Sequence, residues 1–465
     1  MISLPGLNLG EQPAEPLNVP TSSATRHQDL AAQTEYRFEV NFQRQLTIKL
    51  VNGTAEYFGT ELAPATTYTF QGAKGAIFTW HGCKIEIGGE AESEYVAEET
   101  QMMPAMNAHF AFEAQRDRAV QTRDAGPRVL VVGPENAGKT SLVKILTSYA
   151  VKSGRQPMVI NLDPKQGMLS VPGSFTAAAF SSIIDIEEGW GSSPMSGPSP
   201  VPVKMPLVYH YGLKDPEEGR VFRPLVTRMA LAVTSRLEED PASKQAGFII
   251  DSPGSMSQGK AGVYENIEHI ISEFSVNVVF VIGSERLYSD LSRKYAHRPN
   301  EDPTHIIRLD KSGGCVDRSE EYMKALRHAQ IRAYFFGHGD AALAPHSQSA
   351  TFDELNIFKI AEETGRDFSG GHHIDNPYGN ASDAEIYERI TPSNMVVNKL
   401  LAVTTAAATE GHGAIRDASV RGYMYVADAD EAKKRVKLLS PQPGQVPASA
   451  IVMGSWPEDV PSLVG

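Results

Sequence analysis

The spacing of apolar residues divides the chain into three parts. From Tyr36 to about residue 100, short β-branched and aromatic runs alternate with Gly, Asn and Pro roughly every ten residues, a spacing typical of a small antiparallel sandwich or barrel. From residue 126 to 337, near-continuous apolar runs alternate with amphipathic stretches, and this alternation predicts a parallel α/β sheet. Beyond residue 338 the runs are mixed, and they indicate a small β-rich domain.

Two segments interrupt this pattern. Residues 1–33 are rich in Pro, Ser, Thr and Ala without periodicity, so they are predicted to form a disordered arm. The Ser/Pro/Gly-rich stretch 189–206 is predicted to be a mobile surface loop. The predicted domains are an N-terminal β-sandwich at 34–104, a linker helix at 105–125, an α/β domain at 126–337 and a C-terminal β-rich domain at 338–465.

Composition adds two constraints to this picture. The formal net charge of −13 disfavours broad, non-specific nucleic-acid binding, so any RNA is expected to be reached mainly through partner proteins. No apolar run approaches the roughly 18–20 residues of a membrane helix, and the N-terminus lacks the features of a signal peptide. The two cysteines, Cys83 and Cys315, are far apart and have no metal-site spacing, which indicates a reducing compartment, the cytosol or the nucleus.

The stretch "GPENAGKT", from Gly133 to Thr140, fits the pattern G-x-x-x-x-G-K-[ST]. It follows an apolar strand and precedes a helical stretch, which is the context that a phosphate-binding loop requires. Successive backbone N–H groups and the helix N-terminus form an anion hole there, and Lys139 can neutralise the outer phosphates. The central domain is therefore predicted to be an α/β P-loop NTPase core. The predicted nucleotide-binding residues of the loop are Gly133, Asn136, Ala137, Gly138, Lys139, Thr140 and Ser141.

Two aspartates end apolar strands and are candidates for the metal and for chemistry. Asp251 ends "GFIID" and is followed by "SPG", which places a carboxylate where P-loop proteins hold Mg²⁺. Asp163 ends "VINLD" and could act as a base towards a hydroxyl or a water. Either aspartate could instead simply cap a turn. Thr140, Asp163 and Asp251 form the predicted Mg²⁺ site, and the absence of an Asn-Lys-x-Asp element after the later strand favours ATP over GTP.

The order of several longer motifs is specific to one family. The chain resembles the pre-mRNA cleavage and polyadenylation factor subunit of the polynucleotide 5′-hydroxyl-kinase family, the fungal-type cleavage factor IA subunit. The resemblance extends from Tyr36 to Gly337 and more weakly to the C-terminus. The matching stretches include "YRFEV", "FGTEL", "FTWHGC", "GPRVLVVGPENAGKTS", "LDPKQG", "ERLYSDL", "VDRS" and "IRAYFFG".

The resemblance carries expectations about location, partners and ligand contacts. It implies a nuclear protein of the mRNA 3′-end processing machinery, bound to a scaffold subunit that also contacts RNA polymerase II and to other 3′-end processing subunits. It also implies that Glu35 and Lys74 of the N-terminal domain lie over the adenosine of ATP. From the residues alone, both would be surface positions of a sheet.

Whether the chain is a kinase depends on a few positions. By resemblance, active members use residues matching Lys139, Asp163 and Arg318 to phosphorylate the 5′-hydroxyl of RNA. Ser255 stands where active members have a base-stacking Trp, and Met323 stands where they have a second arginine. Two functions remain open: an ATP-binding structural subunit needed for pre-mRNA cleavage and scaffold assembly, or an active RNA 5′-hydroxyl kinase. The two departures favour the first and make the catalytic set vestigial.

Overall fold

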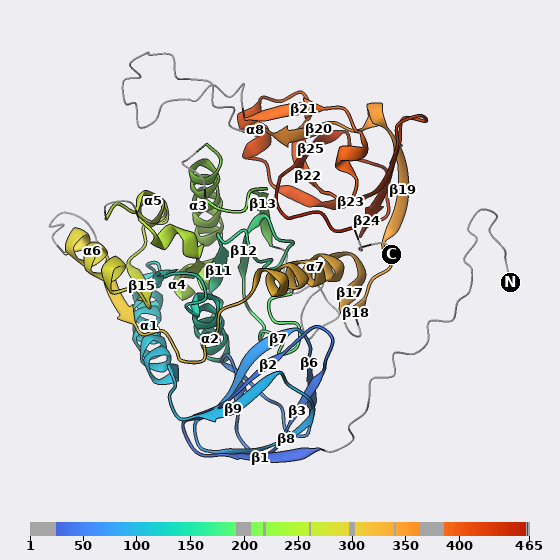
Figure 1. The fold of residues 1–465 in the computed structure, drawn as a ribbon. Coiled ribbons are helices and arrows are strands. Elements are labelled where there is room, and N and C mark those ends of the chain that lie inside the picture. The colour runs from blue at the N-terminus through green and yellow to red at the C-terminus, as the bar shows by residue number, and fades with distance from the viewer. Residues whose placement is uncertain are drawn as a thin grey trace.

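The computed structural model describes residues 25–191, 206–216, 220–259, 262–296, 303–338, 341–361, 386–461 and 463. The chain folds into a sandwich, a central α/β part and a C-terminal β part, coloured blue, teal to yellow and orange to red in Figure 1. Most of the predicted mobile loop 189–206 lies outside the described residues. The N-terminal β-sandwich, the P-loop core and the β-rich C-terminal domain predicted from the sequence are confirmed.

The N-terminal domain consists of two packed sheets, in strand orders β1-β8-β3-β6 and β5-β4-β7-β2-β9. Leu46, Ile48, Ile77 and Ile85 are buried between them, as alternation along half-buried strands requires. The strands are β1 Arg26–Leu30, β2 Thr34–Val40, β3 Leu46–Gly53, β4 Glu56–Tyr57, β5 Thr60–Glu61, β6 Thr67–Phe70, β7 Ala73–Thr79, β8 Cys83–Gly89 and β9 Ser93–Ala97.

The prediction of a disordered arm at 1–33 is wrong for its last part. All five residues of β1 pair antiparallel with β8, and β2 begins at Thr34. The sequence RHQDL has no apolar alternation, so its order comes from the backbone ladder to β8 and from buried Leu30. Residues 1–24 lie outside the described residues.

The central sheet has seven strands in the order β13-β12-β11-β14-β10-β15-β16. The prediction of a parallel sheet is wrong for β12, which runs antiparallel to β11 and β13. The connection from β11 to β12 contains no helix, and without a crossover element the chain returns in the opposite direction. The strands are β10 Arg128–Val132, β11 Met158–Asn161, β12 Ser174–Ala179, β13 Leu207–His210, β14 Phe248–Asp251, β15 Val278–Ile282 and β16 His305–Leu309.

Helices cover the central sheet, and the connecting helix α1 packs against α2 and α4 (Figure 1). The helical stretch predicted after the phosphate-binding loop corresponds to α2. The helices are α1 Met102–Thr122, α2 Lys139–Lys152, α3 Phe222–Glu239, α4 Pro241–Ala246, α5 Glu265–Glu273, α6 Glu285–Tyr295 and α7 Glu320–Phe336, with a 3-10 turn, η1, at Gly254–Ser257.

The C-terminal part is a seven-stranded sheet in the order β19-β24-β23-β22-β25-β20-β21, whose two faces have different partners. Tyr423 and Tyr425 of β23 join the core of the central domain, whereas Met424 and Val426 face a separate core within the C-terminal part. The elements are β17 Gly337–His338, β18 Ala341–Ala342, β19 His346–Thr351, η2 Phe352–Glu354, β20 Ile357–Ile360, β21 Tyr387–Ile390, η4 Asn394–Val396, β22 Leu400–Ala407, α8 His412–Arg416, β23 Val420–Asp430, β24 Arg435–Ser440 and β25 Ser449–Met453.

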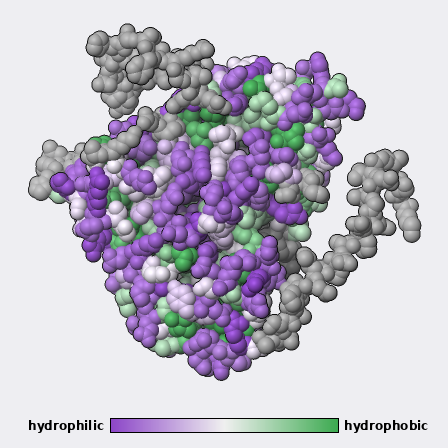
Figure 2. Space-filling view, in the orientation of Figure 1, coloured by the Kyte–Doolittle hydropathy of each residue, from purple (hydrophilic) through white to green (hydrophobic). Residues whose placement is uncertain are grey.

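The surface agrees with the acidic, polar composition of the chain. On the face drawn in Figure 2, hydrophilic residues cover most of the molecule and hydrophobic residues occur in small patches. Within the described part of the chain, no helix has the length and apolar character needed to cross a bilayer.

Candidate nucleotide-binding site

A cavity of about 450 Å³ lies where the sandwich meets the central domain, a volume within the range of small-molecule sites. Its walls come from β2 and β7 of the sandwich, from the predicted phosphate-binding loop and α2, and from the segment between β16 and α7. Polar groups from all three regions line it, and they include most of the predicted site residues.

The phosphate-binding loop has the backbone conformation that its glycines permit. Gly133 directly follows β10 at φ 154°, and a Cβ there would lie 2.5 Å from the carbonyl oxygen of Ile282. Gly138, at φ 90°, directly precedes α2, and a Cβ there would lie 2.9 Å from Cys315 Sγ. Only glycine can adopt these torsions with neighbouring atoms so close. The loop therefore curves tightly and leads its backbone N–H groups to the N-terminus of α2, which is the arrangement that an anion-binding site requires.

Asp251 and Thr140 lie together on adjacent elements. Strand β14 pairs with β10 so that Asp251 lies beside Val131, two residues before the loop begins at Gly133. Thr140 Oγ1 donates a hydrogen bond to Asp251 Oδ2 over 2.6 Å, while Asp251 Oδ1 is buried without a hydrogen-bond partner among the described residues. A buried carboxylate oxygen without a partner is costly unless a ligand satisfies it, and this geometry fits Mg²⁺ or one of its waters.

Lys139 lies within electrostatic reach of both aspartates. Its Nζ donates a hydrogen bond to the carbonyl oxygen of Pro134 over 2.9 Å, and burial lowers the pKa of its ammonium group against the opposing effect of Asp251 and Asp163. Burial raises the pKa of Asp251 to about 6, although Lys139 partly counteracts this. The loop is therefore a desolvated charge cluster, in which added phosphates and a divalent cation would each meet groups of opposite charge.

Asp163 is fixed by the turn that follows β11. Its Oδ1 accepts a hydrogen bond from the backbone N–H of Lys165 over 3.0 Å, and Asn161 Nδ2 donates to the Asp163 carbonyl oxygen over 3.1 Å. Burial raises the pKa of the Asp163 carboxyl group. The structure brings Asp163 to the same cavity as Lys139, and its two proposed roles, as base and as metal ligand, stay predictions.

Arg318 connects the phosphate-binding loop to the turn after Asp163. Its Nε donates to Asn136 Oδ1 over 2.9 Å, and its Nη1 donates to Gln166 Oε1 over 3.0 Å. Both contacts lie at the cavity wall, so the guanidinium faces the space above the loop. This is where a charge could act on a phosphoryl group.

The structure also brings Glu35 and Lys74 to the cavity, on the paired strands β2 and β7. Glu35 Oε2 accepts a hydrogen bond from Arg37 Nε over 2.7 Å, and Lys74 forms an ion pair with Glu39. The Lys74 ammonium group lies 5.2 Å from the centre of the Tyr322 ring, within cation–π range. Their contact with adenosine stays a prediction.

Arg37 and Tyr322 are among the cavity residues that the prediction missed. Arg37 had a detectable signal, because charged residues at 35, 37 and 39 alternate along one strand and must share one face. Tyr322 donates to the carbonyl oxygen of Gly72, which joins α7 to the sandwich. Nothing in the local sequence of α7 indicates this long-range contact.

Ser255 and Met323, the positions that depart from active kinases, occupy different environments. Met323 is 9% exposed, and it lines the cavity from the first turns of α7. Ser255 lies in η1, directly after cavity residue Gly254, and its hydroxyl is buried without a hydrogen-bond partner in the described structure. Neither side chain offers a charge or a ring to a substrate.

Among the residues that the structure describes, no group of three or more His, Cys, Asp or Glu side chains could hold a metal ion. A cation beside Thr140, Asp251 and Asp163 would therefore need oxygen ligands from water and from a nucleotide. This is the usual arrangement for Mg²⁺, which keeps several waters and binds substrate phosphates.

Replacing Asp251 with Asn is expected to stabilise the nucleotide-free protein at pH 7.5 by about 1–3 kcal/mol. The folded-state pKa of about 6 exceeds the ordinary value of 3.8, so ionised Asp251 costs stability increasingly as pH rises from about 4 to 6. The stabilisation produced by Asp251→Asn should fall to roughly half of its pH 7.5 value at pH 5. Denaturant unfolding at the two pH values measures it, and exposed Asp124→Asn is the matched control. An equal effect at both pH values would contradict this assignment.

Comparisons with known proteins cover all three parts of the chain. The family model described as "mRNA cleavage and polyadenylation factor CLP1 P-loop" matches residues 133–337. The model of the "N-terminal beta-sandwich domain of polyadenylation factor" matches residues 29–119, and that of "Pre-mRNA cleavage complex II protein Clp1" matches residues 343–458. The chain belongs to the Clp1 family.

Relatives within the Clp1 family match over the full length of the chain. The mRNA cleavage and polyadenylation factor of Phaeosphaeria nodorum is 70% identical over 468 residues, with 100% of both chains covered. That of Botryotinia fuckeliana is 48% identical over 471 residues, again with 100% of both chains covered. The family resemblance drawn from the sequence motifs is thus confirmed.

Two solved structures of Clp1p with Pcf11p share the fold. One, a wild-type complex with a Pcf11p fragment, has a TM-score of 0.81 and 26% identity, and covers 94% of this chain and 98% of that one. The other, from work on an extended Pcf11p interface and on ATP loss in a glycine-to-arginine mutant, has a TM-score of 0.81 and 27% identity, and covers 93% and 98%.

Proposed function

We propose that the chain is an ATP-binding structural subunit of the nuclear machinery that cleaves and polyadenylates mRNA 3′ ends. The observation that carries this proposal is a complete phosphate-binding loop, closed over by the sandwich, in a member of the Clp1 family. Groups suited to binding a nucleotide line the cavity, which supports the proposal, whereas Met323 and Ser255 supply neither the charge nor the ring that phosphoryl transfer to RNA would use.

The proposed ligand is ATP with Mg²⁺. The chemistry supports both: N–H groups and Lys139 suit the phosphates, and the hydrogen-bonded pair of Thr140 and Asp251 suits the cation. Bound Mg²⁺ would neutralise charge on the outer phosphates. Glu35 and Lys74 lie far from the loop in sequence but line the same cavity, which supports a role for them at the adenosine end.

Glu35→Gln and Lys74→Met are each expected to weaken ATP binding by about 1–3 kcal/mol, because each would leave a polar partner unpaired. Calorimetric titration measures the loss. Lys49→Met serves as the control, since Lys49 lies on β3, in the sheet of the sandwich that does not line the cavity. Wild-type affinity in both cavity variants would remove the proposed adenosine contacts.

The proposed partner is a scaffold subunit related to Pcf11, because two solved relatives are complexes of Clp1p with Pcf11p. Contacts with RNA polymerase II and with other 3′-end processing subunits would then follow through the scaffold. The net charge of −13 supports RNA contact through these partners rather than directly.

The experiment for the scaffold role is affinity capture from nuclear extract, with and without ribonuclease treatment. We expect the tagged protein to recover a Pcf11-related subunit and other cleavage factors in both conditions. The Lys139→Ala variant should recover the scaffold less well only if nucleotide supports docking. Recovery of RNA without any cleavage-factor subunit would count against the proposal.

An RNA 5′-hydroxyl kinase is the second candidate function, and one observation favours it. Lys139, Asp163 and Arg318 all line one cavity, as a transfer reaction would require. In that case Lys139 and Arg318 would stabilise the transferring phosphoryl group, and Asp163 would accept the proton of the RNA hydroxyl.

A further inference from the structure

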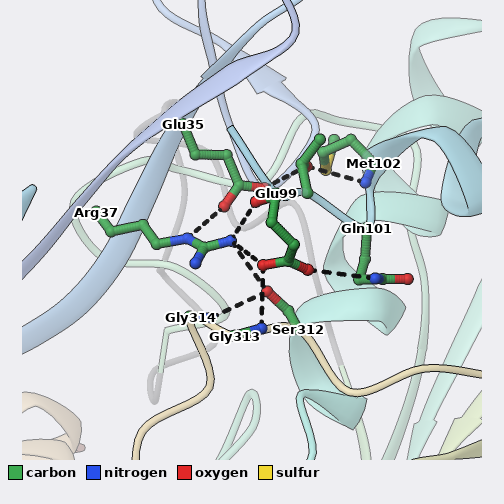
Figure 3. A network of polar contacts seen from close by, with 9 residues as sticks. Glu35, Arg37, Glu99, Gln101, Met102, Ser312, Gly313 and Gly314 are labelled. Atoms are coloured by element: carbon green, nitrogen blue, oxygen red, sulfur yellow. Dashed lines mark hydrogen bonds and ion pairs between the residues drawn. The ribbon is translucent and has the colours of Figure 1, made fainter. Parts of the chain in front are cut away.

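Arg37 lies where three segments of the chain meet at the cavity (Figure 3). Its Nε donates to Glu35 Oε2 over 2.7 Å on the same strand. Its Nη2 donates to the carbonyl oxygen of Glu99 over 2.6 Å and to Glu99 Oε2 over 2.9 Å, on the segment that leads into α1. The same nitrogen lies 3.3 Å from Ser312 Oγ, on the segment between β16 and α7.

The segment at 312–318 is held closely against this guanidinium. Glu99 Oε2 also accepts a hydrogen bond from the backbone N–H of Gly313 over 3.1 Å. A Cβ on Gly314 would lie 2.7 Å from Arg37 Nε, so the backbone there packs directly on the arginine. Figure 3 shows Glu99 and Ser312, from two different segments, side by side at the guanidinium of Arg37.

The other end of segment 312–318 contacts the phosphate-binding loop. Cys315 Sγ lies against Gly138, and Arg318 Nε donates to Asn136 Oδ1 over 2.9 Å. Arg37 is therefore linked in one direction to Glu35 and in the other, through a short stretch of backbone, to the loop that would hold phosphates.

The chemistry of arginine suits this position. The Arg37 side chain is 8% exposed and has acidic partners on both sides, Glu35 and Glu99, so its charge is compensated where it is buried. A guanidinium presents donors in a rigid, planar fork, whereas lysine has one flexible ammonium group that cannot reproduce this geometry. Lysine could keep the pairing with Glu35 but would lose the contact with the segment at 312.

We propose that Arg37 is a positioning residue of the nucleotide site, which fixes Glu35 and the segment 312–318 together and so slows the release of bound nucleotide. The proposal rests on the proposed binding of ATP. At one end of the cavity Arg37 holds Glu35 in place. At the other end it holds the segment that carries Arg318, which in turn contacts Asn136. In this role Arg37 need not touch the nucleotide itself.

The test measures dissociation of a fluorescent ATP analogue from the full chain by stopped flow, in the presence of Mg²⁺. Arg37→Lys is expected to accelerate release about tenfold or more, because charge-assisted hydrogen bonds to the segment are lost. Glu99→Ala, at a half-exposed side chain, should accelerate release several-fold. The double variant, Arg37→Lys with Glu99→Ala, should release the analogue little faster than Arg37→Lys alone, because both changes remove the same contact. Arg26→Lys, which alters the Arg26–Glu94 ion pair elsewhere in the sandwich, is the matched control.

Hydrogen exchange of the nucleotide-free protein separates positioning from general stability. Arg37→Lys should raise exchange at Gly313, Gly314 and Asn136, while the buried strands β3 and β8 keep wild-type protection. Unchanged release rates in both Arg37→Lys and Glu99→Ala would overturn the positioning role, as would a uniform loss of protection across the sandwich. A wild-type chain that binds no MgATP would overturn the proposed nucleotide function and this inference together.

Discussion

Lys139→Ala is expected to remove about half or more of the stabilisation that MgATP gives to the wild-type chain. At a hundredfold excess over its dissociation constant, a ligand stabilises a protein by about 2.7 kcal/mol. Lys139 is buried at the loop, where the carboxyl groups of Asp163 and Asp251 both favour its charged form. Its ammonium group would contact the outer phosphates of ATP. Losing this charge should weaken binding by roughly ten- to a hundredfold, in line with charge-assisted hydrogen bonds of about 1.5–3 kcal/mol.

Thermal shift with and without MgATP measures this effect. Lys152→Ala is the matched control, because Lys152 ends the same helix but its side chain is 56% exposed, far from the loop. Thr140→Ala should lose chiefly the Mg²⁺-dependent part of the shift, since its hydroxyl is bonded to Asp251. Equal shifts in wild type and Lys139→Ala would refute the proposed phosphate site.

The second large effect concerns transfer chemistry, and we expect little or no RNA 5′-kinase activity. An arginine on the transferring phosphoryl group contributes roughly 10³–10⁵ in rate in related P-loop enzymes, and Met323 brings no charge to the cavity. Lys324 is exposed, and Arg327 is committed to ion pairs with Glu458 and Glu320. Only Arg318 faces the loop from this segment, and Asn136 and Gln166 already engage it.

Base placement is the other deficit. Stacking of a base on an aromatic ring contributes about 1–3 kcal/mol, and a misplacement of about 1 Å can cost on the order of a hundredfold in rate. Ser255 has no ring, so an RNA end would lack this support. The assay is transfer of labelled γ-phosphate to a 5′-hydroxyl RNA oligonucleotide, with Asp163→Ala as control. Robust wild-type transfer that disappears in Asp163→Ala would establish the kinase instead.

Local chemistry made part of the site predictable from the sequence. The loop from Gly133 to Thr140 depends on torsions and donors that a few adjacent residues supply, and the pattern around it identifies the strand and the helix. Asp251 and Asp163 follow from a general property of α/β sheets, whose strand ends line one crevice. Family resemblance, rather than local physics, pointed to Glu35 and Lys74.

Long-range contacts account for what the sequence did not predict. Strand β1 is ordered by β8, about sixty residues along the chain, and antiparallel β12 depends on how the chain leaves β11. Arg37 joins Glu99 and Ser312, which lie 62 and 275 positions away, so no window of local sequence includes these two partners. Such contacts are set by tertiary packing, which intrinsic propensities do not encode.

The shared core between the central and C-terminal parts has a consequence for synthesis of the chain. The indole Nε1 of Trp456 donates to the carbonyl oxygen of Pro164, the residue after Asp163, across 292 positions. Strand β25 inserts between β22 and β20, so the C-terminal sheet also closes late. On the ribosome, the turn that carries Asp163 acquires its last donor only after Trp456 has emerged. A nascent central domain would expose part of its apolar core until then, and would be a client for chaperones during that interval.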